Sequence, residues 1–409
     1  MVEAAGRTRE AGALMAVGIA HPHGRDLISA AADGSGRRAV LAGMAACGLN
    51  ALLPGGARSA VMPSKPTLFG VNSYDLFYNY FRNSATSRDP ARRLEAMAKQ
   101  GIPFVRFSAS PFWPNEWDIY DSNPEAAMKR LDRIVASAET LGIKLIPTLI
   151  WHPAGLSDHF GEPVSAWGDP ASRARTFARR YYAQIVSRHV GSPAIMAWEA
   201  SNEFNAFAGR EQSERFFPPV NVRAGTPDRR SPKDRFSWAD VEGHYEEFGR
   251  IVRSIDPGRP ISTGANIPRS HMMNNLLRVP SPDSPKQFAQ ALQLSLAGRA
   301  DILSLHIYPD SASGRFGEQG PSYSQILGVA RQVAVAHKAR LLVGEFGVKT
   351  SENPRKDKAE FSDQVRAMSM AGVDYAALWV YDCDFMPGWT VTRSNDRSWQ
   401  WAMLREANA

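Results

Sequence analysis

The stretch of sequence that decides the fold spans residues 195–205 and reads IMAWEASNEFN. It begins as an apolar run directly after a Gly-Ser-Pro turn signal, which is typical of a buried strand. It ends on two adjacent polar residues, Asn202 and Glu203. Burying an amide and a carboxylate without partners is costly. This ending therefore favours a strand that opens into a pocket, where a carboxyl group donates or accepts a proton. The alternative is that Glu203 is an ordinary exposed residue at a strand end.

Further apolar runs flank this stretch from residue 66 onward, and segments of helical period alternate with them. The other predicted strands are residues 68–74, 104–108, 144–151, 260–266, 302–308, 341–346 and 375–381. The predicted helices are residues 90–99, 124–141, 170–189, 238–255, a region ending near 296, 323–337 and 357–371. A polar, Pro-rich insertion at residues 208–237 follows the opening strand, and a short tail ends the chain.

Continuous apolar strands joined by crossover helices indicate a parallel sheet. Eight such strands most simply close into a (β/α)8 barrel of the α/β class. No Ser/Gly/Pro linker divides residues 66–405, so we predict one catalytic domain over residues 61–409. An open, doubly wound sheet would need a glycine-rich phosphate turn after its first strand, and the Gly-Val-Asn-Ser at residues 70–73 is not one.

Residues 1–60 differ from the rest because they are rich in Ala and Gly and show little periodicity. The pair Arg37-Arg38 precedes a moderately apolar run through Leu53, and small residues follow at 57–60. This order predicts a cleaved export signal, and the paired arginines favour the twin-arginine type. We therefore expect a periplasmic or secreted protein. Two alternatives remain open: a disordered extension from a mis-assigned start, and lipid attachment at Cys47.

The composition is that of a globular protein, with 409 residues, 44% hydrophobic and 22% charged. The net charge of +7 is a mild excess. No long Lys/Arg array suggests a nucleic-acid partner, and the densest basic run, residues 229–235, is expected to be a solvated loop. The apolar run in the leader is shorter than the ~20 residues of a membrane span. If the leader with Cys47 is cleaved off, Cys383 has no partner for an intrachain disulfide. We also expect the mature protein to be a monomer.

In a (β/α)8 barrel the active site lies at the C-terminal ends of the strands. The polar and aromatic residues predicted there are Arg106, His152, Asn202, Glu203, His306, Tyr308, Glu345 and Trp379. Each has a structural explanation by itself, because a lone His near a strand end is more often a satisfied polar residue and a lone Trp is usually core. Their occurrence together at the strand ends is harder to explain in this way.

Two of these residues, Glu203 and Glu345, are carboxylates on different strands. Cleavage of a glycosidic bond needs such a pair, one carboxyl group protonated and the other ionised. Arg106 can hold one carboxylate ionised, and a carboxyl group that shares the pocket with that anion has a raised pKa. Asn202 and Tyr308 can donate to the 2-hydroxyl of a sugar or to the nucleophile. Trp379 offers a flat apolar face to a sugar ring.

With these residues the chain resembles glycoside hydrolase family 5, the cellulase and β-mannanase family of the retaining (β/α)8 clan. The family pattern is Arg after strand two, His after strand three, Asn-Glu after strand four, His-x-Tyr after strand six, Glu after strand seven and Trp after strand eight. The matching residues here are Arg106, His152, Asn202-Glu203, His306-Ile307-Tyr308, Glu345 and Trp379. The resemblance covers the chain from about residue 66.

The resemblance implies that Glu203 is the acid/base and Glu345 the nucleophile of a double displacement on a β-linked polysaccharide. It implies that Arg106, His152, Asn202, His306, Tyr308 and Trp379 bind substrate, with no cofactor and no metal. His159 lies in the same loop as His152 and is an alternative to it. The two carboxyl groups are expected about 5–5.5 Å apart.

The choice of substrate stays open, because no residue distinguishes β-1,4-glucan from β-1,4-mannan, or internal from terminal cleavage. Aromatic side chains expected in loops on the same face could line a cleft or simply pack those loops; they are Phe112, Trp113, Trp117, Trp167 and Trp389. Two other classes compete: a non-catalytic carbohydrate-binding barrel, and a barrel enzyme with a glutamate as enolising base. The acidic residues 382–384 suggest a metal site less well than a solvated or substrate-lining loop.

Overall fold

The computed structural model describes residues 65–82, 89–210, 212, 214, 218–317 and 320–409. The predicted export signal at residues 1–60, with Arg37-Arg38 and Cys47, lies outside the described residues. Within them, no helix is both long and apolar enough to cross a membrane. The division of the chain into a leader and one catalytic domain from residue 61 stays a prediction.

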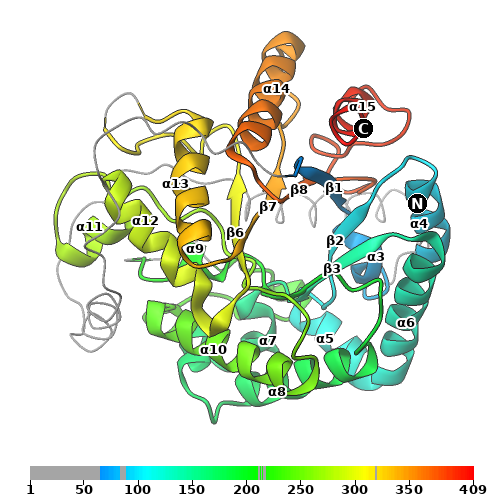
Figure 1. Ribbon diagram of the computed structural model, residues 1–409. Coiled ribbons are helices and arrows are strands. Elements are labelled where there is room, and N and C mark those ends of the chain that lie inside the picture. Colours follow the sequence, from blue (N-terminus) through cyan, green and yellow to red (C-terminus); the bar gives the residue numbers. More distant parts are fainter. Residues whose placement is uncertain (1–64, 83–88, 211, 213, 215–217, 318–319) are drawn as a thin grey trace.

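Eight parallel strands form a closed barrel in which each strand pairs with the next and β1 pairs with β8 (Figure 1). The predicted (β/α)8 fold is therefore confirmed. The strands are β1 (Leu68–Asn72), β2 (Phe104–Ser108), β3 (Lys144–Ile150), β4 (Trp198–Ser201), β5 (Ile261–Ser262), β6 (Ile302–Ile307), β7 (Arg340–Phe346) and β8 (Tyr375–Leu378).

Helices surround the barrel, with α4 and α6 beside β2 and β3 and with α13 and α14 beside β6 and β7 (Figure 1). The α-helices are α3 (Asp75–Tyr78), α4 (Pro90–Ala98), α5 (Pro114–Ser122), α6 (Pro124–Leu141), α7 (Pro153–His159), α8 (Arg173–Arg188), α9 (Phe204–Phe207), α10 (Trp238–Ile255), α11 (Met272–Leu277), α12 (Pro285–Gln293), α13 (Tyr323–Ala336), α14 (Pro354–Ala371) and α15 (Ser398–Ala407). Short 3₁₀ helices are η1 (Val164–Gly168), η3 (Val222–Ala224), η4 (Pro232–Asp234) and η5 (Leu294–Arg299).

The bounds of α6 and α10 agree with the prediction because both helices carry strong end signals. The Asn123 side chain accepts from the amide of Ala126, and Gly142 ends α6 in the left-handed conformation. Ser237 and Asp240 form a capping box at the start of α10. The predicted tail instead contains α15, whose C-terminal Asn408 donates to and accepts from the backbone of Phe69 in β1, at 2.8 Å each.

Strand β5 is shorter than predicted because the chain turns away at Gly264, which has φ +68°. A Cβ atom there would lie 1.8 Å from the carbonyl oxygen of Ser201, so only glycine allows the loop after β5 to approach β4 so closely. The carbonyl of Gly264 in turn accepts from the amide of Glu203 at 2.9 Å. This contact fixes the end of β4, where the opening stretch becomes a loop.

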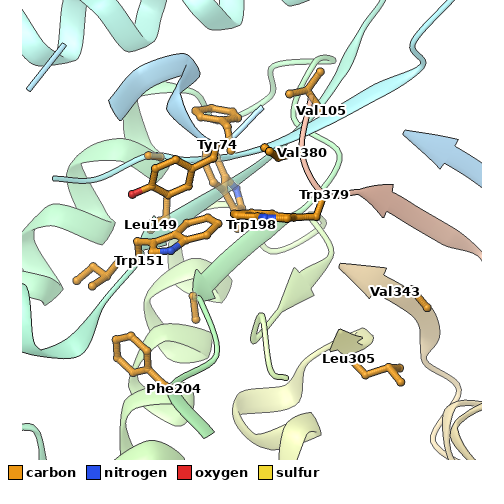
Figure 2. Close-up of a cluster of buried hydrophobic side chains, with 14 of the residues drawn as sticks. Tyr74, Val105, Leu149, Trp151, Trp198, Phe204, Leu305, Val343, Trp379 and Val380 are labelled. Carbon is orange, nitrogen blue, oxygen red and sulfur yellow. The ribbon is translucent and has the colours of Figure 1, made fainter. Parts of the chain in front are cut away.

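The interior of the barrel is built in layers because side chains alternate along each strand. An apolar layer occupies the N-terminal end; it consists of Phe104, Ile146, Ala197, Ile302, Leu342 and Ala377. Two residues further along three of these strands, the inward positions are polar and buried: Arg106, Thr148 and Glu199. The intervening residues, such as Val105, Leu149 and Val343, belong to the larger core that packs under the helices (Figure 2). The polar layer is the base of the site described next.

Candidate active site

Arg106 is the centre of the polar layer. It comes from β2, is completely buried, and donates to four side chains. Its Nε lies 2.7 Å from Glu199, Nη1 lies 3.0 Å from Asn72 and 2.9 Å from Glu345, and Nη2 lies 2.7 Å from Asn202. Burial opposes the charge of the guanidinium, but Glu199 and Glu345 outweigh it and raise the pKa of Arg106. Arg106 is thus a fixed cation under the site.

Sequence reasoning missed Glu199, the buried partner of Arg106. Its carboxylate also accepts from Thr148 Oγ1 at 2.7 Å and Ser262 Oγ at 2.9 Å. The signal was present, because a carboxylate in the middle of a buried apolar strand needs a cationic partner. The apolar residues on both sides of Glu199 obscure this signal. Asn72 was missed in the same way, inside the first strand.

Glu345, in β7, is buried and held by two donors. Arg106 Nη1 donates to its Oε1, and the Tyr308 hydroxyl donates to its Oε2 at 2.6 Å. Burial raises the pKa of Glu345, while the charges of His306 and Arg106 and the hydrogen bond from Tyr308 oppose that rise. Burial also raises the pKa of Tyr308 well above its ordinary value, which keeps the phenol protonated as a donor.

Glu203 follows β4 in the left-handed conformation, with φ 55° and ψ 25°. A non-glycine residue in this region costs backbone energy and occurs where the surroundings impose it. The turn directs its carboxylate to His306, whose Nδ1 lies 2.7 Å from Glu203 Oε1. Ligand-type atoms of Glu203, His306 and Glu345 all lie within 4.8 Å of one another. The two carboxyl groups from strands four and seven therefore share one small site.

His306 occupies its place because β7 has no side chain opposite it. A Cβ atom at Gly344 would lie 2.8 Å from His306 Nε2. The pairing of β6 with β7 shifts register between Leu305 and His306, so His306 lies beside Glu345. The glycine before Glu345 thus sets the position of the histidine.

Glu203, His306 and Glu345 are also the one group among the described residues with three closely spaced ligands for a metal ion. Glu345 already bonds the Arg106 cation, and a second cation would lie close to that charge. Asp382, Cys383 and Asp384 do not form such a group in the described part of the chain. Asp382 pairs with Arg93, and Asp384 pairs with Arg82.

His152 lies after β3, as predicted, but it caps a helix. Its Nδ1 accepts from the amide of Ala154 at 3.2 Å, and its ring packs against Phe112 and Phe207. Burial, and then the charge of Arg230, lower the pKa of His152 to about 3, so the ring is neutral at pH 7. The alternative His159 lies at the far end of α7, beside Asp118 and Asp121.

Trp379 forms part of an aromatic group after β8 and β3. Its ring stacks on Trp151 with centroids 6.0 Å apart, and Tyr74 meets Trp151 edge-on at 4.7 Å (Figure 2). The Arg106 guanidinium lies 5.0 Å from the centre of the Trp151 ring. Trp379 is buried, yet its indole N–H has no hydrogen-bond partner among the described residues. The buried indole N–H of Trp117 also has no partner among the described residues, so this feature alone does not indicate a ligand.

The five other aromatic residues expected at a cleft differ in exposure. Trp117 is buried against Phe177 and Tyr181, and the buried Trp167 donates its N–H to the carbonyl of Pro153. For these two residues the second alternative holds, because their rings pack the loops that contain α5 and η1. Phe112 and Trp113 are also buried. Trp389 is half-buried, and its ring lies 5.3 Å from that of Tyr308.

A separate cavity of about 540 Å³ lies at the opposite end of the barrel. It is lined by Arg253, Pro257, Gly258, Pro260, Arg299, Asp301, Lys338 and Arg340. Arg253 lies in the last turn of α10, and the other residues lie just before or at the start of β5, β6 and β7. Among the residues that line this cavity, Asp301 is the one carboxylate, so it lacks the carboxylate pair that Glu203 and Glu345 form at the other end of the barrel.

Comparison with known proteins gives a consistent family. The model described as cellulase (glycosyl hydrolase family 5) matches residues 65–382. A mannan endo-1,4-beta-mannosidase A from Podospora anserina is 45% identical over 154 residues, which are 33% of this chain and 39% of that protein. A probable mannan endo-1,4-beta-mannosidase A from Aspergillus niger is 25% identical over 274 residues, 64% of this chain and 60% of that protein. The chain thus matches less than two thirds of the length of these relatives.

Solved structures show the same barrel. The endo-1,4-beta-D-mannanase of Thermotoga petrophila aligns with a TM-score of 0.58 at 16% identity, over 83% of this chain and 99% of that one. An endoglucanase of Pseudomonas stutzeri aligns with a TM-score of 0.54 at 16% identity, over 85% of this chain and 96% of that one. At these identities the likeness shows the fold.

Proposed function

From the premise that this chain belongs to the cellulase family, glycosyl hydrolase family 5, we propose that it is a retaining glycoside hydrolase that cleaves β-1,4-mannan internally. The observation that carries the proposal is the proximity of Glu203 and Glu345, because one carboxylate oxygen of each lies within 4.8 Å of the other. Direct displacement by water needs carboxyl groups about 6.5–9.5 Å apart, whereas double displacement needs about 5–5.5 Å. The spacing therefore favours double displacement with retained configuration.

In the first step, Glu345 is the nucleophile. Its carboxylate oxygen attacks the anomeric carbon while the proton of Glu203 passes to the leaving glycosidic oxygen, and a glycosyl ester forms. Arg106 and Tyr308 donate to the Glu345 oxygens, so they favour its ionised form. In the second step, water gives its proton to Glu203 and attacks the anomeric carbon, which releases the sugar and restores the Glu345 carboxylate.

The surrounding donors orient the sugar. Asn202 Oδ1 accepts from Arg106, so the NH₂ of Asn202 remains to donate to a sugar hydroxyl. Trp379 is buried against Trp151 and supports the site through this stacking. His306 fixes the Glu203 carboxylate from Nδ1. His152 has an indirect role: it caps α7 and packs against Phe112 and Phe207.

Mannan is the favoured substrate because the curated relatives are named as mannan endo-1,4-beta-mannosidases. Endo-β-1,4-glucanase activity is the second candidate, supported by the endoglucanase among the structural neighbours. Hydrolysis of galactomannan, glucomannan, carboxymethylcellulose and aryl β-glycosides, with anomer analysis by NMR, tests the proposal. We expect the highest kcat/KM on a mannan and the β-anomer as the first product. Release of the α-anomer first would overturn retention, and cleavage of carboxymethylcellulose alone would assign a glucanase.

We also propose that residues 1–60 direct export by a twin-arginine route and that the mature protein is a monomer acting on a glycan rather than on nucleic acid. The paired Arg37-Arg38 before an apolar run supports the export proposal. Replacing both arginines by lysine should keep the protein inside the cell. Export that persists in this variant would contradict the route.

The acid limb of the pH profile is expected above the pKa of about 4.3 of an ordinary glutamate. Burial raises the pKa of Glu345, and the nucleophile must be ionised, so kcat/KM rises as the pH rises through that pKa. The hydrogen bond from Tyr308 lowers the pKa of Glu345. Tyr308→Phe should therefore move the acid limb to higher pH. Tyr120→Phe, which removes a hydroxyl bonded to Gln184, is the control and should leave the limb unchanged; an unmoved limb in Tyr308→Phe would contradict the assignment.

A further inference from the structure

The insertion after α9 is fastened to α7 by a buried ion pair. Arg230 Nη1 and Nη2 lie 2.6 and 2.8 Å from the two carboxylate oxygens of Asp158. Both side chains are only 2% exposed. Arg230 also donates to the carbonyls of Pro218 and Pro219, at 3.2 and 3.0 Å. One guanidinium thus ties both ends of the segment 218–230 to the last turn of α7.

Further contacts hold the rest of the insertion. Asp234 accepts from the amide of Val164 in η1 at 3.2 Å and from the amide of Ser231 at 2.8 Å. The ring of Phe236 packs against Phe204 with centroids 5.8 Å apart. Phe204 directly follows Glu203, so the end of the insertion packs against the segment that carries the proposed acid. We name residues 218–237 the insertion wall.

The insertion wall lies on the side of the barrel that carries Glu203. Its contacts are with α7 after β3, with η1, and with α9 after β4, and a Cβ at Gly225 would touch Pro114, at the start of α5 after β2. The charge of Arg230 lowers the pKa of His152 at the end of β3. Glu345 belongs to β7, across the barrel. An acid that protonates the leaving oxygen faces the departing sugar, so the wall stands on the leaving-group side.

We propose that the insertion wall forms one boundary of the subsites for the departing sugars and that Arg230 is the positioning residue that holds it there. The inference rests on the proposed function, because it assumes an oligosaccharide cut between Glu203 and Glu345. A buried carboxylate is costly unless it is paired, and Asp158 finds its partner in Arg230 of the wall. Loss of Arg230 releases the wall from its anchor without altering a residue that touches the reacting atoms.

The test compares two substrates that differ only on the leaving-group side. Mannohexaose places sugars against the wall, whereas an aryl β-mannotrioside releases a phenol. In Arg230→Ala we expect kcat/KM on mannohexaose to fall roughly 10-fold or more, mainly through KM, because misplaced binding groups lose positioning. On the aryl mannotrioside we expect less than about a 2-fold change. The bond that is cut in mannopentaose should also shift, because fewer sugars bind on the leaving-group side.

Two further variants keep the result decisive. Arg230→Lys preserves the charge but not the two-pronged contact, so it should show an intermediate loss if Arg230→Ala does not fold. Arg235→Ala removes an arginine of the same insertion that pairs with Glu214 nearer the surface, and it should leave the ratio of the two activities unchanged. Equal losses on both substrates, or an unchanged ratio in Arg230→Ala and Arg230→Lys, would overturn the positioning role. A wild type inactive on both substrates would instead refute the proposed function.

Discussion

Replacing Glu345 by glutamine is expected to lower kcat/KM on β-1,4-mannan by at least about 10⁴-fold, as removal of a covalent nucleophile does in other enzymes. The amide keeps the size of the carboxylate but cannot form the glycosyl ester. Arg106 and the Tyr308 hydroxyl, which donate to the carboxylate at 2.9 and 2.6 Å, would also face an NH₂ group. The same substitution at Glu246, exposed on α10, is the control and should leave activity unchanged.

The two carboxyl groups can be told apart by rescue with azide. In Glu203→Gly, kcat/KM on mannan should fall about 10²–10⁴-fold, the usual range for loss of a general acid. The fall should be much smaller on an aryl glycoside, because its phenolate leaves without needing a proton. With azide, Glu203→Gly should form the β-glycosyl azide by attack on the ester, whereas Glu345→Gly should form the α-azide by direct displacement of the phenolate. The opposite pair of products would exchange the two roles.

Arg106→Met is expected to abolish activity and to lower the free energy of unfolding by about 3–5 kcal/mol, the range for breaking a buried ion pair from one side. The variant would leave Glu199 fully buried, and within the described part of the chain the hydroxyls of Thr148 and Ser262 would be its remaining side-chain donors. Glu345 would lose its cationic partner as well. Denaturant unfolding and turnover of mannan measure the two losses.

A matched substitution at Arg188 separates burial from charge. Arg188→Met removes an arginine that bonds Glu125 and Asp132 at the surface. Exposed ion pairs contribute little to stability, so this variant should lose much less stability than Arg106→Met. The double variant Arg106→Met/Glu199→Gln should regain part of the lost stability, because the uncompensated charge is gone, but no activity. If Arg106→Met alone lowered the free energy of unfolding by less than about 1 kcal/mol, the buried hydrogen-bond network around Arg106 would be contradicted.

The strand ends were predictable because each polar residue there interrupts an apolar run. Glu203, His306 and Glu345 stand out in the sequence for this reason. The bounds of α6 and α10 were predictable because capping residues mark the ends of these helices. Glu199 was missed because it lies within its run, and its partner Arg106 is 93 residues away in sequence. No local pattern reports a contact of that range, although a lone charge in a buried strand is a signal that a partner exists.

The loops were predicted less well because their structure depends on tertiary contacts. Helices α5, α7 and α9 are only four to nine residues long, so no helical period identifies them. The packing of these helices decides which aromatic rings remain exposed at the site. Trp117 and Trp167 are buried for this reason, although each of them, like Trp389, lies in a loop region that follows a strand. The left-handed backbone of Glu203 depends on the approach of the Gly264 loop, which the sequence of β4 alone cannot indicate.

The pairing of β1 with β8 has a consequence for the order of events during synthesis. The first strand begins at Leu68 and its partner at Tyr375, so about 300 residues must be added before the barrel can close. At ~5–20 residues per second, roughly 15–60 s pass in which β1 has left the ribosome without that neighbour. During this interval one edge of the nascent sheet is open to other chains. Ribosome-bound chains halted before β8 should therefore bind chaperones more strongly than chains that include α15.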